Sequence, residues 1–167
     1  MRAISCCGSL PNDSAMFARK IATTARLLCA SPSYLARRGA PQSPDDLRWH
    51  SCLRIARRHQ LLDRWRLMRA GETFEVAVSG PLSSGDGSVL YEWALSGEGI
   101  SLEAHWDVAD DLAAGRLVDV MPDYRGAPAE LYAVFAPGKP VPPRIRLFAD
   151  YLAKAFERIQ QGDRDRN

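Results

Sequence analysis

Residues 29–39 read CASPSYLARRG, a short apolar run followed by a serine-proline pair and closed by a glycine. Serine caps free backbone amides at a helix start, and proline is tolerated in the first turn because it has no N–H to leave unpaired. Gly39 supplies the left-handed residue that ends such helices. The stretch therefore predicts a strand over residues 26–30 that leads through Ser31 into a two-turn helix. In open α/β sheets, ligands bind where strands give way to helices in this manner.

The same kinds of residues that begin and end a helix recur later in the sequence. In QSPDDL (42–47), Ser43 is a cap, Pro44 takes the first helical position and two aspartates favour the positive helix end, which predicts a second brief helix. Gly97 and Gly115 end predicted helices over residues 88–96 and 107–114. The strongest helical pattern comes last and predicts one buried face, formed by Ile145, Phe148, Leu152, Phe156 and Ile159.

Apolar segments between these helices predict strands. They cover residues 52–55, 65–68, 74–82, 117–121 and 131–135, and a further strand begins near residue 100. Strands that alternate with helices favour parallel pairing through crossover helices. The sequence therefore predicts an α/β fold in which the strands are mainly parallel.

Composition limits the classes of protein that the sequence can represent. The chain has 167 residues, 46% of them hydrophobic, and a net charge of +2, so it can bury a core and is not basic overall. No apolar run approaches the length of a membrane span, and the N-terminus lacks the apolar core of a secretion signal. We expect a soluble, cytoplasmic protein that does not bind membranes.

The cysteines and histidines give weak signals. Cys6, Cys7, Cys29 and Cys52 lack C-x-x-C spacing, which favours free thiols over disulfides or zinc. His50 and Cys52 form only a pair of potential metal ligands, so no metal site and no cofactor are expected. There is no G-x-S-x-G motif and no pair of carboxylates outside helix starts, so the chain is not predicted to be an enzyme.

A group of arginines surrounds Trp65 and raises the alternative of a nucleic-acid interface. The group comprises Arg54, Arg57, Arg58, Arg64, Arg66 and Arg69. Because no pattern predicts that these side chains share one face, a solvated surface is the favoured interpretation.

Several segments together carry a family resemblance. They read GSLPNDSAMFARKI (8–21), LLCASPSYLARRGAPQSPDDLRWHSCL (27–53), VSGPLSSGDGSVLYEWALSGEGIS (78–101), VADDLAAGRLVDVMPDY (108–124), LYAVFAPG (131–138) and PPRIRLFADYLAKAF (142–156). Trp65 and Gly71 add to the pattern. In this combination the chain resembles the effector-binding (substrate-binding) domain of LysR-type transcriptional regulators, over most of residues 8–156.

The resemblance implies an α/β, periplasmic-binding-protein-like fold of two lobes with a small effector between them. Mapped here, residues 1–31 are a remnant of the first lobe, 32–136 form a complete second lobe, 137–160 return to the first lobe with a helix, and 161–167 are a polar tail. The winged helix-turn-helix of the family and the first half of lobe one have no counterpart in this sequence. We therefore expect a truncated regulator with an incomplete first lobe.

Two helix openings are the predicted effector site. Backbone amides near Ser31 and Ser33, and near Ser83 and Ser84, attract carboxylate or phosphate groups, and the four hydroxyls add hydrogen bonds. The resemblance adds the strand residues Ile100 and Ser101. Capping of each serine's own helix, with no ligand, is an equally good account of any single serine.

The leading hypothesis is an effector-sensing domain that binds a small anionic metabolite, a carboxylate, and contacts DNA only through a domain absent from this chain. An alternative is an interaction fragment that forms homodimers or pairs with a full-length regulator. A solute-binding protein of a transporter is a further alternative, disfavoured by the missing signal peptide.

Overall fold

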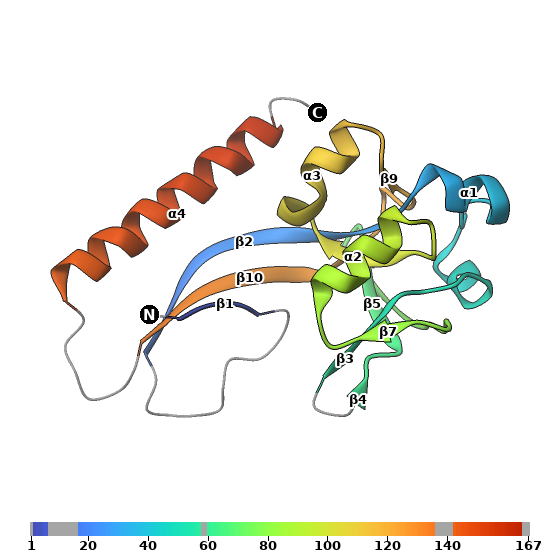
Figure 1. Cartoon of the computed structure of the whole chain (residues 1–167), viewed down its shortest axis with the longest axis horizontal. Coiled ribbons are helices and arrows are strands. Elements are labelled where there is room, and N and C mark those ends of the chain that lie inside the picture. Colours follow the sequence, from blue (N-terminus) through green and yellow to red (C-terminus); the bar gives the residue numbers. More distant parts are fainter. Residues whose placement is uncertain (1, 7–16, 58–59, 136–141, 165–167) are drawn as a thin grey trace. The chain divides into compact units, whose positions relative to one another are not determined.

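The computed structural model describes residues 2–6, 17–57, 60–135 and 142–164, and they form two compact units. One unit comprises Met1–Thr24 and Ala129–Asn167, and the other comprises Ala25–Pro128. Two long neighbouring strands, β2 (Phe17–Ala30) and β10 (Arg125–Phe135), run through both units (Figure 1). The lobe boundaries expected from the sequence, at 31/32 and 136/137, lie just past the ends of these two strands.

Helix α1 (Pro32–Arg38) forms as the opening motif predicts. The backbone N–H of Tyr34 donates to Ser31 Oγ at 3.3 Å, and Gly39 ends the helix with a φ of 74°. Tyr34 is buried and reaches the next segment, because its hydroxyl accepts a hydrogen bond from the Ser51 N–H at 3.0 Å. The Ser-Pro and glycine signals therefore fix both ends of this helix.

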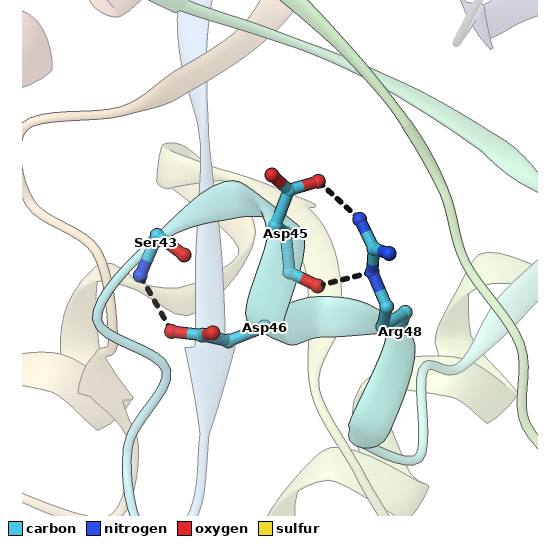
Figure 2. A network of polar contacts seen from close by, with 4 residues as sticks. All are labelled: Ser43, Asp45, Asp46 and Arg48. Atoms are coloured by element: carbon cyan, nitrogen blue, oxygen red, sulfur yellow. Dashed lines mark hydrogen bonds and ion pairs between the residues drawn. The ribbon is translucent and has the colours of Figure 1, made fainter.

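The predicted brief helix is a 3₁₀ helix, η1 (Pro44–Trp49). The Asp46 carboxylate accepts hydrogen bonds from the backbone N–H groups of Gln42 and Ser43, each at 2.9 Å, and these bonds hold its pKa below the ordinary value. Figure 2 shows the contact between Ser43 and Asp46 beside the exposed ion pair of Asp45 with Arg48.

Two further helices, α2 (Gly87–Leu95) and α3 (His105–Ala113), confirm the predicted helical segments. Asp86, rather than a serine, caps α2: its carboxylate accepts from the Ser88 N–H at 2.9 Å. Gly97 and Gly115, with φ of 84° and 68°, follow the two helices as the sequence predicts.

The strands form two described sheets. The larger has the order β6–β5–β10–β2–β8, with β1 on β10 and β9 on β2, and the smaller has the order β4–β3–β7. Their bounds are β1 Arg2–Cys6, β3 Arg54–Arg57, β4 Gln60–Leu61, β5 Arg64–Arg69, β6 Glu72–Ala77, β7 Ser83–Ser84, β8 Ser101–Ala104 and β9 Val118–Asp119.

The prediction of mainly parallel pairing is wrong. Strand β2 is antiparallel to β8 and β9, and β5 is antiparallel to β6 and β10. Strand β3 is parallel to β7. The physical reason is connection length: β5 and β6 are joined by Ala70 and Gly71, with φ of 49° and 85°, and two residues permit a hairpin but no crossover.

Residues 51–53 join the two sheets and close a ring of strands. The Ile100 N–H donates to the Ser51 carbonyl and the Leu53 N–H to the Ile100 carbonyl, each at 2.8 Å. On the other side, the Cys52 N–H donates to the Ser79 carbonyl at 2.8 Å, in the chain that continues from β6. Hydrogen bonding therefore runs from β8 through residues 51–53 to β6, β5, β10, β2 and back to β8.

Alternation along β2 separates two apolar clusters in the second unit. Leu28 and Ala30 pack with residues that include Leu67 and Ile100, whereas Leu27 and Cys29 pack with residues of α2 and α3. Leu28, Leu67 and Ile100 are fully buried. This two-sided burial explains why residues 27–30 read as a continuous apolar run.

The first unit has its own cluster around α4 (Pro143–Arg164). Ile145, Leu152 and Phe156 pack against strand residues that include Ile21 and Ala133, as the helical pattern predicts. The prediction that Phe148 belongs to the buried face is wrong: its side chain is 45% exposed, and Ala149 is buried instead. Ile159 lies outside the described side chains, and residues 161–164 of the predicted tail are helical.

The helices in the described part of the chain do not combine the length and apolar character that a membrane span requires.

Candidate functional site

A cavity of about 430 Å³ opens in the second unit, beside α2. Its apolar lining is Leu53, Ile55, Leu62, Trp65, Leu90, Leu102 and Ala127, and its charged lining is Arg26, Arg64, Arg66 and Glu75. The lining comes from β2, β3, β5, β6, β8, β10, α2, Leu53 just before β3 and Leu62 between β4 and β5, so segments distant in the sequence assemble the cavity. A cavity of this size suits a small molecule.

Among the charged residues of the lining, Arg26 is the least exposed to solvent. It lies on β2 opposite Ala104 of β8, on the same face as Leu28, so the strand period directs it toward the interior. Gly126 makes room for it: a Cβ at that glycine would come within 3.1 Å of Arg26 Cβ. Sequence and packing therefore place a guanidinium group where a buried strand normally carries an apolar side chain.

The guanidinium of Arg26 lacks a complete set of partners. Its Nε is buried and has no hydrogen-bond partner in the described structure. Burial lowers the pKa of Arg26, and the neighbouring positive charge of Arg57 lowers it further, while the negative charges of Glu103 and Asp107 oppose the shift. A half-buried cation with a buried, unpaired N–H is stabilised by any anion that supplies the missing hydrogen bond.

The other charged groups of the cavity are exposed. Arg64 Nη1 and Glu75 Oε1 form an ion pair at 3.0 Å, and Glu75 lies opposite Arg66 in the β5–β6 register. Exposed ion pairs contribute little to stability or binding because solvent screens them. Arg26 is therefore the dominant electrostatic feature of the cavity.

The predicted site residues Ser31 and Ser33 lie elsewhere. Ser31 is buried and its hydroxyl lies 2.9 Å from the hydroxyl of Ser33. Both hydroxyls face Gly97, where a Cβ would approach them within 2.6–3.2 Å, and Arg37 donates to the Gly97 carbonyl at 2.6 Å. This opening of α1 is thus packed against the chain that follows the C-terminal end of α2.

Ser83 and Ser84 lie before the other end of α2. They form β7, which pairs with Arg54 and Ile55, and the Ser84 hydroxyl accepts from the Asp86 N–H at 3.1 Å. A helix of nine residues is about 13 Å long. The two serine pairs are therefore separated by the length of α2, and the structure does not bring them together.

Ile100 and Ser101 are interior residues of the strand region. Ile100 is fully buried and pairs with Cys52, and Ser101 is buried with its hydroxyl donating to Glu103. Burial raises the pKa of Glu103, an effect that the Ser101 hydrogen bond partly offsets. None of the six predicted site residues lines the cavity.

His50 and Cys52 each have other partners. His50 Nδ1 lies 3.1 Å from the Tyr34 hydroxyl, and Cys52 Sγ donates to the Leu47 carbonyl at 3.5 Å. Burial raises the pKa of the Cys52 thiol to about 12, so it stays protonated near neutral pH. Cys29 and Cys52 are free thiols, whereas Cys6 and Cys7 lie outside the described side chains.

Comparisons with known proteins give a consistent result. The family model of the LysR substrate binding domain matches residues 5–157. The HTH-type transcriptional regulator DmlR of Escherichia coli K12 is 38% identical over 141 residues, which are 84% of this chain and 46% of DmlR. The HTH-type transcriptional activator TtdR of the same strain is 38% identical over 77% of this chain and 41% of TtdR. The chain spans less than half the length of these two relatives.

Solved structures agree. The regulatory domain of CrgA from Neisseria meningitidis matches 86% of this chain and 71% of its own, with a TM-score of 0.72 and 30% identity. Full-length AphB of Vibrio cholerae matches 87% of this chain and 50% of its own, with a TM-score of 0.70 and 28% identity. The predicted α/β, periplasmic-binding-protein-like fold is confirmed.

Proposed function

Because the chain belongs to the LysR substrate-binding domain family, we propose that it senses a small anionic metabolite for a transcriptional regulator and binds it in the arginine-lined cavity. The observation that carries the proposal is the buried Nε of Arg26, a residue of the cavity wall, which has no hydrogen-bond partner among the residues that the structure describes. A carboxylate oxygen is a strong acceptor for this group.

The test is direct titration of the 167-residue protein with small carboxylates by calorimetry. We expect Arg26→Gln to weaken carboxylate binding about 10- to 100-fold, because hydrogen bonds to charged groups are worth about 1.5–3 kcal/mol. Arg48→Gln is the matched control, since Arg48 is an exposed arginine of the same unit, paired with Asp45 and outside the cavity (Figure 2). Circular dichroism of each variant checks that it is folded.

If the Arg26→Gln and Arg48→Gln variants bind carboxylates with equal affinity, the proposal is contradicted. The double substitution Ser31→Ala and Ser83→Ala separates this site from the helix openings suggested by the sequence. We expect it to leave carboxylate affinity unchanged, because neither serine lines the cavity.

The proposed regulatory consequence follows from the two long strands. Arg26 lies on β2 and Ala127 on β10, the strands that continue into the first unit. A ligand that binds one arrangement of the units more tightly than another shifts their populations, which is how an effector acts on a regulator. The proposal includes a cytoplasmic location and DNA contact by the regulator. It assigns no catalytic step to this chain, because the relatives are transcriptional regulators.

A second candidate role is self-association through α4. Leu147 and Tyr151 are 69% and 65% exposed, and Phe148 lies between them in sequence. Apolar side chains that gather on one exposed face are typical of interaction surfaces. Sedimentation velocity is expected to show a homodimer that Leu147→Glu dissociates, whereas a monomer at all concentrations would exclude this role.

A further inference from the structure

From the lining of the cavity we infer the class of its ligand: a monocarboxylate with an apolar body, rather than a dicarboxylate. This inference rests on the proposed function, since it concerns the same site. It combines two properties of the lining, namely one half-buried arginine whose Nε is buried and an extensive apolar wall.

The apolar wall is formed by large side chains. It consists of Leu53, Ile55, Leu62, Trp65, Leu90 and Leu102. They come from β3, β5, β8, α2, the residue before β3 and the segment between β4 and β5, so several separate elements contribute to the wall. A hydrocarbon body gains affinity on such a wall, about three- to fourfold for each methylene group buried. A second carboxylate placed there loses its hydration and gains no partner.

Of the arginines that line the cavity, Arg26 is half-buried, whereas Arg64 and Arg66 are exposed. The Nε of Arg26 is buried and finds no hydrogen-bond partner in the described part of the chain. Arg64 is already paired with Glu75 at 3.0 Å, and Arg66, opposite Glu75, has an exposed side chain. Charges in contact with solvent add little to affinity, so the cavity has one strong anchor for an anion.

Acidic groups near this anchor disfavour a second negative charge. Glu103 and Asp107 lie close enough to Arg26 to oppose the lowering of its pKa, and Glu75 lines the cavity. A dicarboxylate that places one group on Arg26 directs its other group toward apolar side chains, toward Glu75, or toward the exposed Arg64 and Arg66. The first two placements weaken its binding relative to a monocarboxylate of the same length, and the third adds little because solvent screens these arginines and Glu75 offsets their charge.

The test uses three probes with the same six-carbon chain: hexanoate with one carboxylate, adipate with a carboxylate at each end, and hexanamide with a neutral amide in place of the carboxylate. Calorimetric titration of the 167-residue protein is expected to give hexanoate at least tenfold higher affinity than adipate or hexanamide. Arg26→Gln should remove the advantage of hexanoate over hexanamide. Arg66→Gln should change hexanoate affinity less than twofold, because this arginine is exposed.

The outcomes separate the two proposals. Adipate binding as tightly as hexanoate, with the same dependence on Arg26, would overturn the ligand class and leave the proposed function standing. If Arg26→Gln leaves the affinity for both hexanoate and adipate unchanged, both proposals are overturned. The wild-type comparison of the three probes needs no variant, so the ligand class is tested even where a substitution at Arg26 unfolds the protein.

Discussion

Substitution of Gly99 by alanine is expected to destabilise the second unit by about 4 kcal/mol. A Cβ at this position would lie 2.3 Å from the Ser51 carbonyl oxygen, which is backbone and cannot rotate away. Residues 51–53 must then move, which breaks the two 2.8 Å hydrogen bonds with Ile100 and opens the ring. Overpacking costs about 1–3 kcal/mol and each lost hydrogen bond about 1 kcal/mol. Urea unfolding followed by circular dichroism measures the change.

Gly87→Ala is the matched control for this substitution. No atom lies within 4 Å of a Cβ at Gly87, and alanine is the better residue in a helix. We expect the control to be neutral or slightly stabilising. A Gly99→Ala protein as stable as the control would show that residues 51–53 do not close the ring as described.

Leu28→Ala is the second substitution with a large expected effect, a loss of about 3 kcal/mol. Leu28 is fully buried in the cluster that contains Leu67 and Ile100, and removal of its side chain leaves a cavity that rigid neighbouring strands cannot fill. The denaturant midpoint should fall while the slope of the unfolding transition stays constant.

Leu61→Ala provides the comparison for Leu28. Leu61 lies on the short strand β4 and is 37% exposed, so its truncation should cost less than about 1 kcal/mol. Similar losses for the two leucines would mean that Leu28 is not at the centre of a packed core.

Local chemistry made the helices predictable. Ser31 with Gly39, Ser43 with Asp46, and the glycines after α2 and α3 act on backbone groups within a few residues, so the sequence alone contains the whole cause. Sheet pairing depends on contacts between distant segments. The Ala70-Gly71 hairpin lacks the common Asn-Gly or Asp-Gly signal, and alternation of strands with helices gave the wrong direction for most pairs.

The orientation of α4 shows a second limit. Phe148 and Ala149 are adjacent, and a helical period places either one on the packed face within the precision of such a pattern. Hydrophobicity favoured phenylalanine, but Ala149 faces Ile21 and Ala133, where a small residue lets helix and strands approach closely.

The cavity was not predicted, because its lining comes from segments between residue 26 and residue 127 that come together only in the folded chain. Serines at helix openings drew attention by their hydroxyls, although Ser31 is occupied by capping and Ser101 by Glu103. One signal was available. Arg26 alternates with Leu28 and Ala30 in a predicted buried strand, and a charge at an inward position is the exception that requires a partner.

The order of synthesis gives the ring a kinetic consequence. A growing chain cannot complete this pocket before β10 has emerged, since Ala127 forms part of its wall and β10 bridges β2 and β5. Pairings between such distant segments form late in folding. A molecule bound in this pocket is therefore expected to slow unfolding without speeding folding, because its binding surface is complete only after residue 127 has been synthesised and packed.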